Sequence, residues 1–265
     1  MIRRRLTVGW LLVGMAACGG GGSSPTPTAP APIPAADACA ALGATSSGTA
    51  ILSGAVCSSA NSAVVRVNLR TPSGFSAGIC SGTLIAPRAV LTAAHCLDDD
   101  VTVALIFLGS GEQITGSSIH YYPNFVFNTP NVFDVGVILF DQDIPRTPIP
   151  LLTSRQGQVG EAAVIAGWGR DENDVTTNLK AGSTTLSAVN ESFLQTIFAP
   201  PSASVCSGDS GGPILLSEGG QWTVGGITSA TSSSACNTGT NFYQAVFNTS
   251  VRNFILQHVP AAGQR

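Results

Sequence analysis

Short apolar runs separated by turn-forming residues recur along most of the chain. The first run, residues 64–69, places valine or leucine at alternate positions and ends at the turn-forming residues 71–74. Further runs of strand length cover residues 81–85, 89–91, 101–108, 135–140, 159–166, 214–216, 222–227 and 242–247. Many short strands at such spacing predict an all-β barrel or sandwich. The proline-rich residues 145–150 near the middle predict a junction between two halves.

A helical period is visible only at the C-terminal end of the chain. Apolar residues there recur at helical spacing and fall on one face, namely Val251, Phe254, Ile255 and Val259. Either Asn248 or Thr249 precedes them as a candidate N-cap. The pattern therefore predicts a C-terminal helix on an otherwise β-rich chain.

The first 50 residues have a different character. Three arginines and the short apolar run 6–15 are typical of a signal peptide, which we predict over residues 1–17. The sequence Met-Ala-Ala-Cys before and at Cys18 resembles the lipobox of bacterial lipoproteins, whose cysteine receives lipid; the alternative is an ordinary signal peptide with an incidental cysteine. Residues 19–36 are rich in Gly, Ser, Pro and Thr and predict an extended tether. We expect residues 18–50 to be anchor, tether and propeptide, and residues 51–265 to be the folded domain.

Composition narrows the classes of partner and compartment. Hydrophobic residues make up 44% of the chain and charged residues 10%, with a formal net charge of −3 and a single lysine. No basic patch is visible, so we do not expect nucleic acid as a partner. Of seven cysteines, six remain after Cys18, and in an exported chain they can close three disulfides, with the pairing left open.

Three segments together offer a base, an acid and a hydroxyl nucleophile. They are Leu-Thr-Ala-Ala-His-Cys at 91–96, Phe-Asp-Val-Gly-Val-Ile-Leu at 133–139 and Cys-Ser-Gly-Asp-Ser-Gly-Gly-Pro at 206–213. A serine hydroxyl needs a base to take its proton, which His95 can do near neutral pH. Asp134 heads an apolar strand that would bury it, and a buried carboxylate fixes the imidazole tautomer. Gly208 and Ser210 can supply backbone N–H donors to an oxyanion.

The other aspartates and histidines suit these roles less well. Asp98, Asp99 and Asp100 form a charged run directly after Cys96, which is typical of a solvated loop. The same interpretation applies to Asp141 and Asp143, and we interpret His120 and His258 as structural.

These segments resemble those of the chymotrypsin–trypsin family of serine proteases, as does Ala-Gly-Trp-Gly at 166–169, and the resemblance runs from about residue 51 to residue 259. It implies two six-stranded antiparallel β-barrels with a C-terminal helix. It also implies a serine endopeptidase, acting through an acyl-enzyme at Ser210, with His95 and Asp134 as the other triad members. Substrates would be proteins or peptides, the chain would be a monomer, and no metal or organic cofactor is implied.

The resemblance extends to supporting residues. Ser229 matches the family serine that hydrogen-bonds the triad aspartate. Ile51 begins a segment similar to the family's new N-terminus, whose ammonium would pair with Asp209 after cleavage at Ala50–Ile51; a simple early strand is the alternative. Cys80–Cys96 and Cys206–Cys236 match family disulfides, which leaves Cys39–Cys57.

The resemblance also suggests the specificity of the primary pocket. Ser204 aligns with its base, where trypsin-like enzymes carry Asp, and Thr231 and Asn241 align with its walls, where the family often has Gly. This predicts a shallow, elastase-like pocket for small or medium apolar side chains, with a chymotrypsin-like preference as the rival. Ala230-Thr231 departs from the Trp-Gly of the family.

Other classes of function remain as alternatives. One is a catalytically silent binding or adhesion module with a protease-like fold, although such proteins usually lose a triad member. An esterase using the same nucleophile is another, against which the order His, Asp, Ser counts. Because Gly19 rather than Asp follows Cys18, an outer-membrane or cell-surface location is favoured over the inner membrane.

Overall fold

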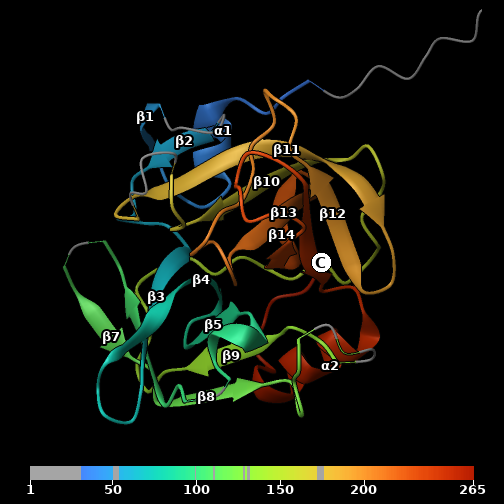
Figure 1. Ribbon diagram of the computed structural model, residues 1–265. Coiled ribbons are helices and arrows are strands. Elements are labelled where there is room, and N and C mark those ends of the chain that lie inside the picture. Colours follow the sequence, from blue (N-terminus) through green and yellow to red (C-terminus); the bar gives the residue numbers. More distant parts are fainter. Residues whose placement is uncertain are drawn as a thin grey trace, which may run out of the picture.

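The computed structural model describes residues 31–49, 54–98, 100–109, 111–127, 129, 132–171 and 176–265. Two antiparallel β-sheets lie one above the other, with a short helix at the N-terminal side and a longer one beneath (Figure 1). The predicted signal peptide, Cys18 and Ile51 lie outside the described residues. None of the described helices is long and apolar enough to span a bilayer.

The first sheet contains β3 (Val64–Arg70), β4 (Ser76–Ala86), β5 (Ala89–Thr92), β6 (Val103–Phe107), β7 (Gln113–Thr115), β8 (Ser118–Tyr121) and β9 (Gly136–Leu139). Its strand order is β7-β6-β3-β4-β5-β9-β8. The two ends of this order are joined by Gly116 and Ser117, which donate backbone hydrogen bonds to Ala104 in β6 (2.9 Å) and Leu139 in β9 (2.7 Å). A Cβ on Gly116 would lie 2.5 Å from Ile138, so glycine permits this kink. β7 and β8 therefore act as one bent strand that completes a barrel.

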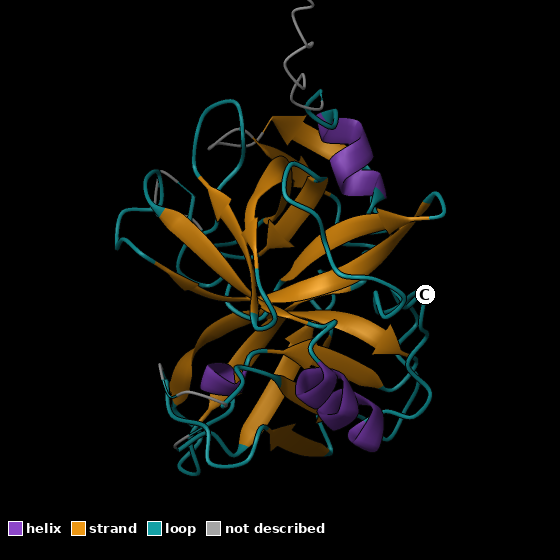
Figure 2. Cartoon of the chain, turned by 90° about the vertical axis from the view of Figure 1, so that its right-hand side faces the viewer, coloured by secondary structure: helices purple, strands orange, loops and turns teal. Residues whose placement is uncertain are grey.

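The second sheet contains β1 (Ser46–Thr49), β2 (Gly54–Cys57), β10 (Ala162–Gly167), β11 (Leu179–Val189), β12 (Phe193–Ile197), β13 (Pro213–Glu218), β14 (Gln221–Thr231) and β15 (Thr240–Ala245). Its order is β1-β2-β11-β10-β13-β14-β15-β12, and an additional β11–β12 pairing closes the last six strands into a barrel. The segment 145–150 precedes β10, at the change from one sheet to the other, and the cartoon shows the strands in an upper and a lower group (Figure 2). The predicted all-β fold is confirmed.

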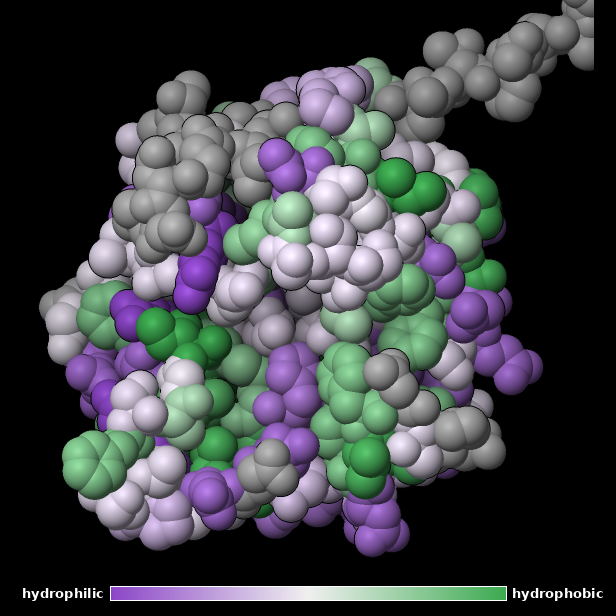
Figure 3. Space-filling view, in the orientation of Figure 1, coloured by the Kyte–Doolittle hydropathy of each residue, from purple (hydrophilic) through white to green (hydrophobic). Residues whose placement is uncertain are grey.

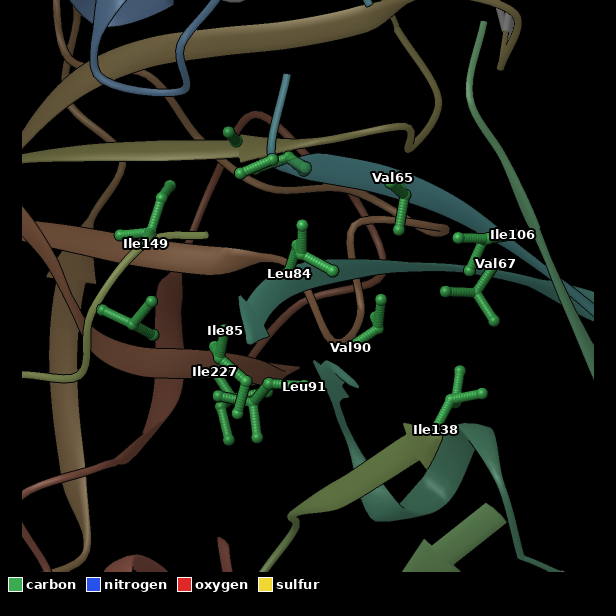
Figure 4. Close-up of a cluster of buried hydrophobic side chains, with 14 of the residues drawn as sticks. Val65, Val67, Leu84, Ile85, Val90, Leu91, Ile106, Ile138, Ile149 and Ile227 are labelled. Carbon is green, nitrogen blue, oxygen red and sulfur yellow. The ribbon is translucent and has the colours of Figure 1, made fainter. Parts of the chain in front are cut away.

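The core follows from alternation along the strands. In β3 the side chains of Val65, Val67 and Leu69 are buried while those between them are partly exposed. Val65 and Val67 pack with Leu84, Val90, Ile106 and Ile138 inside the first barrel (Figure 4). Strand alternation buries one face of each strand, and closing the sheet turns these faces toward one another.

The predicted C-terminal helix is present as α2 (Thr249–His258). Of the two candidate caps, Asn248 takes the role, since its side-chain oxygen accepts hydrogen bonds from the backbone N–H groups of Ser250 and Val251. Val251, Phe254 and Ile255 are buried, and Val259 follows the helix end and is buried as well. His120 and His258, interpreted as structural, stack with ring centroids 4.3 Å apart.

Folded structure begins before residue 51. Helix α1 (Ala35–Ala40) packs on β11 and β2, and Ala38, Cys39 and Leu42 are fully buried. A disulfide joins Cys39 to Cys57 in β2. Residues 35–49 are therefore part of the packed structure, and the disulfide links them covalently to β2.

Candidate active site

His95 and Asp134 contact each other at two points. His95 lies in the 3₁₀ helix η1 (Ala94–Cys96) after β5, and Asp134 precedes β9, the neighbour of β5. The His95 Nδ1 atom lies 2.8 Å from Asp134 Oδ2, and Asp134 Oδ1 accepts a 3.0 Å hydrogen bond from the His95 backbone N–H. Such a contact leaves Nε2 as the ring nitrogen free to accept a proton from a nucleophile.

The Asp134 carboxylate is buried, with 4% of the residue exposed. Ser229 Oγ donates a 2.6 Å hydrogen bond to Asp134 Oδ2, in agreement with the role expected of Ser229. The backbone N–H of Asp134 donates a 3.0 Å hydrogen bond to the side chain of Gln244 in β15. His95 and Ser229 thus fix the orientation of the carboxylate, and Gln244 fixes the backbone that carries it. The rival Asp143 instead lies on the surface against Arg88.

The electrostatics favour a protonated imidazole more than in a free histidine. Burial by itself lowers the pKa of His95, but the hydrogen bond and the negative charge of Asp134, with a smaller effect from Asp98, together raise it above its usual value. Raising the pKa of the imidazole makes it a stronger base toward the proton of an attacking hydroxyl.

The segment that carries Ser210 packs directly beside the histidine loop. A Cβ on Gly211 would lie 2.1 Å from Thr92 Oγ1 and 3.0 Å from the Ala93 nitrogen, two residues before His95. The Ser210 carbonyl accepts a 2.8 Å hydrogen bond from the Ser81 backbone N–H. Cys80, next to Ser81, forms a disulfide with Cys96, next to His95. The three predicted segments therefore meet at the junction of the two barrels.

Gly208 has the left-handed backbone conformation, with φ of 98°, that glycine adopts without strain. Its carbonyl accepts a 2.8 Å hydrogen bond from Ser81 Oγ, which in turn accepts from the Trp168 backbone N–H at 2.9 Å. Among the described residues, no group accepts a hydrogen bond from the N–H of Gly208 or Ser210. Two N–H donors of this kind are what an oxyanion site requires.

Asp209 turns away from Ser210 into the second barrel. Its carboxylate accepts hydrogen bonds from the backbone N–H groups of Gly169 (2.7 Å) and Cys206 (2.8 Å). Burial raises the pKa of Asp209, while these bonds and the charge of Lys180 oppose that increase. The Lys180 ammonium donates to the Gly169 carbonyl. Asp209 and Lys180 also line a small cavity whose wall includes Gly54.

The predicted pocket residues are neighbours, but their side chains differ in role. Ser204 and Asn241 contact each other, with Asn241 Nδ2 3.2 Å from Ser204 Oγ and from Thr196 Oγ1. Asn241 is 1% exposed, whereas Thr231, its partner in the β14–β15 register, is exposed. Cys206 and Cys236 form the third disulfide nearby. Thr231 lines a larger cavity beside Asp134 and Phe127 rather than the space at Ser204.

Three residues of this site were not singled out by the sequence. Ser81 and Gln244 support the nucleophile loop and Asp134, and Phe127 places its ring edge-on to His95 with centroids 5.7 Å apart. Each contact joins segments far apart in the chain, and a serine, glutamine or phenylalanine in a strand or loop carries no local signal of such a role.

Sequence comparison finds related proteins over more than half of the chain. Residues 51–255 match the trypsin family model. Chymotrypsin-2 from Vespa crabro is 32% identical over 173 residues, covering 57% of this chain and 76% of the relative. Chymotrypsin-like elastase family member 1 from Bos taurus is 28% identical over 218 residues, covering 68% and 78% of the two chains.

Among solved structures, HL collagenase superposes with a TM-score of 0.62 at 22% identity and covers 75% of this chain and 93% of its own. This similarity bears on the fold, while the family model covers nearly the whole span from Ile51 to α2. The chain therefore belongs to the trypsin family.

Proposed function

We propose that this protein is a serine endopeptidase that hydrolyses peptide bonds through an acyl-enzyme on Ser210. The observation that carries the proposal is the buried Asp134 carboxylate, held by Ser229 and bonded to His95 Nδ1 at 2.8 Å beside the Ser210 loop. His95 takes the proton of Ser210 as its oxygen attacks the substrate carbonyl. The N–H groups of Gly208 and Ser210 stabilise the oxyanion, and His95 then returns the proton to the leaving amine. A water molecule, deprotonated by His95 in the same way, then attacks the acyl-enzyme and releases the acid product, and Ser210 regains its proton.

A fluorophosphonate probe tests this proposal directly, because it phosphonylates only an activated serine. We expect the processed protein, lacking residues 1–18, to be labelled on Ser210 and to cleave peptides. A folded, processed protein that is neither labelled nor active would favour the silent-module alternative.

We expect the activity to rise with pH through the pKa of His95, since only the neutral imidazole accepts the proton. Asp134 outweighs burial and raises this pKa, so the acid limb of kcat/KM has its midpoint above the free-histidine value of about 6.5. Activity is lost as pH falls through that midpoint. A pH profile of kcat/KM with one small substrate measures it, and a midpoint well below that of free histidine would contradict the assignment.

The primary pocket is proposed to be elastase-like, with Ser204 at its base and Asn241 at its wall, whereas Thr231 lines the neighbouring larger cavity and does not form the second wall predicted for it. The Ser204–Asn241 contact supports a base closed by the amide. We expect Asn241→Gly to deepen the pocket and to raise kcat/KM for Phe relative to Ala before the scissile bond by about tenfold or more, from the added apolar burial. Peptide anilides that differ only in the residue before the scissile bond measure the ratio of kcat/KM for Phe to that for Ala. An unchanged ratio, or Arg cleaved best by the wild type, would overturn the pocket assignment.

Activation is proposed to follow cleavage between Ala50 and Ile51. The cavity at Asp209 is lined by Gly54, three residues after Ile51, and three extended residues span about 10 Å. An ammonium there would offset the cost of the buried carboxylate and hold the Gly208–Ser210 loop. The Cys39–Cys57 disulfide would keep the preceding segment, and with it a lipid anchor at Cys18, attached after cleavage.

Ile51→Pro should prevent both the cleavage and the pairing. We expect it to lower kcat/KM by at least about 10²-fold, comparable to the loss of one oxyanion donor. N-terminal sequencing of the active wild type should find Ile51 exposed. Full activity of the uncleaved chain would contradict this activation, and Lys180 would then be the cation that stabilises the Asp209 carboxylate.

A further inference from the structure

Ser81 is a fully buried polar residue of β4, at the junction between the two barrels. It therefore contributes nothing to the molecular surface, which on the face shown in Figure 3 carries hydrophilic and hydrophobic residues side by side. Strand β4 belongs to the first sheet, whereas the loops that the Ser81 hydroxyl contacts follow β10 and precede β13 in the second. Burying a hydroxyl costs free energy unless it is hydrogen-bonded, so its partners indicate its role.

The Ser81 hydroxyl both donates and accepts a hydrogen bond. Its Oγ atom donates to the Gly208 carbonyl at 2.8 Å and accepts from the Trp168 backbone N–H at 2.9 Å. A hydroxyl has one proton to donate, and here the Gly208 carbonyl receives it. The backbone N–H of Ser81 donates in addition to the Ser210 carbonyl at 2.8 Å. One residue of the first barrel therefore holds the carbonyls of both proposed oxyanion donors.

Two glycines leave room for the Ser81 side chain. A Cβ on Gly167, the residue before Trp168, would lie 2.9 Å from Ser81 Oγ. A Cβ on Gly212 would lie 3.2 Å from Ser81 Cβ, which is closer than the ordinary carbon–carbon contact of about 3.5–4.0 Å. A larger residue at either position would require Ser81 to shift, so the hydroxyl lies in a closely fitted space.

The directions of the two oxyanion donors follow from the peptide groups to which they belong. In a planar trans peptide the C=O and N–H bonds point in opposite directions. The Ser207 carbonyl shares a peptide with the Gly208 N–H and accepts a backbone hydrogen bond of 2.9 Å. The Asp209 carbonyl shares a peptide with the Ser210 N–H and accepts one of 2.8 Å. Each donor N–H therefore points away from the contact that its carbonyl makes.

The peptide that Ser81 holds lies between these two donor peptides. It runs from the Gly208 carbonyl to the Asp209 N–H, which donates a 2.9 Å hydrogen bond to the Cys206 carbonyl. Because Gly208 lacks a side chain, its backbone rotates more easily than that of other residues. Loss of the hydroxyl would remove the acceptor of the Trp168 N–H, on a residue that is 2% exposed. It would also release one end of the central peptide, so that the donor peptides no longer keep a fixed relative orientation.

We propose that Ser81 is a positioning residue of the reaction, whose hydroxyl holds the Gly208–Asp209 peptide so that the N–H groups of Gly208 and Ser210 converge on the oxyanion. The inference rests on the proposed peptidase function. Ser81 holds the loop from the first barrel, whereas the contacts of the Asp209 carboxylate hold it from the second. Preorganised donors stabilise charge that develops only in the transition state, so their loss lowers kcat rather than substrate affinity.

The test compares Ser81→Ala with Ser62→Ala, which removes the hydroxyl of another buried serine. Ser62 is 1% exposed, and its Oγ accepts a 3.0 Å hydrogen bond from the Val64 N–H, so the chemical change and the burial are matched. We expect Ser81→Ala to lower kcat by about 10- to 100-fold, less than removal of an oxyanion donor itself, with KM unchanged. Ser62→Ala should leave kcat close to wild type, even if urea unfolding shows it to be less stable.

A peptide boronate provides the second measurement, because its tetrahedral adduct with Ser210 places an oxygen where the oxyanion forms. We expect its affinity for Ser81→Ala to fall by the same factor as kcat/KM, and its affinity for Ser62→Ala to match the wild type. A general loss of stability would not produce this proportion.

Fluorophosphonate labelling of the wild type separates this proposal from the peptidase function. Folded, processed wild type that is not labelled would contradict that function itself. In labelled, active protein, a kcat of Ser81→Ala within about twofold of wild type would overturn the role of Ser81 alone. A lowered kcat with unchanged boronate affinity would also overturn it, since the loss would not lie at the oxyanion. Ser81→Gly removes the same hydroxyl, should give the same losses, and decides the matter should Ser81→Ala fail to fold.

Discussion

Replacement of Ser210 by Ala is expected to lower kcat by about 10⁶-fold, the order measured when the serine of a convergent triad is removed. Without the Oγ atom no acyl-enzyme forms, and the remaining activity would come from the oxyanion donors and substrate binding. The fold should be unaffected, since Ser210 is tied to its surroundings through its backbone carbonyl, which accepts from the Ser81 N–H.

The measurement combines fluorophosphonate labelling with initial rates on an Ala-containing peptide. Ser217→Ala, at an exposed position on β13, is the matched control and should retain activity within a few-fold, with full labelling. Labelling that persists in the Ser210→Ala protein would assign the nucleophile to another residue.

The second large effect is expected for Asp134→Asn. An amide in place of the carboxylate cannot accept at both Oδ positions from the His95 backbone N–H and His95 Nδ1. The imidazole would then favour the tautomer that presents the wrong nitrogen to Ser210. A related triad loses about 10⁴-fold in kcat on this change, and we expect a similar loss here.

The same variant removes the charge that raises the pKa of His95, so the midpoint of the remaining acid limb should move to lower pH. Asp143→Asn provides the same chemical change at an exposed residue paired with Arg88 and should leave both the rate and the midpoint close to wild type. A loss of less than about tenfold in Asp134→Asn, well short of the related triad, would show that another acid orients His95.

Most strands of the fold could be predicted because their apolar residues are contiguous or alternate. Strands β11 and β12 could not. Most of β11 is alanine, glycine, serine and threonine, and its burial arises from its place between β2 and β10. Strands β7 and β8 are short, and they complete the first barrel as one bent strand only through their contacts with β6 and β9.

The structure of the N-terminal segment could not be predicted from the sequence either. Residues 35–49 carry few large apolar side chains, and their pattern is that of a linker. Five of them, Ala38, Cys39, Ala41, Leu42 and Ala44, are nevertheless buried. Their burial arises because β2 adds to the edge of β11, β1 adds to β2, and the disulfide at Cys39 holds α1 against β2. Pairing partners of this kind are not encoded in any local run of residues.

The sequence by itself determined the strand-rich class, the C-terminal helix and the identity of His95, Asp134 and Ser210 as the residues of interest, because these depend on local periodicity and on short contiguous segments. Tertiary structure alone decided how those residues are supported. Gln244 reaches Asp134 across 110 residues and Ser81 reaches Gly208 across 127, and five phenylalanines converge on one cavity. Side chains that are unremarkable in sequence acquire these roles only when barrel closure places distant strands in contact.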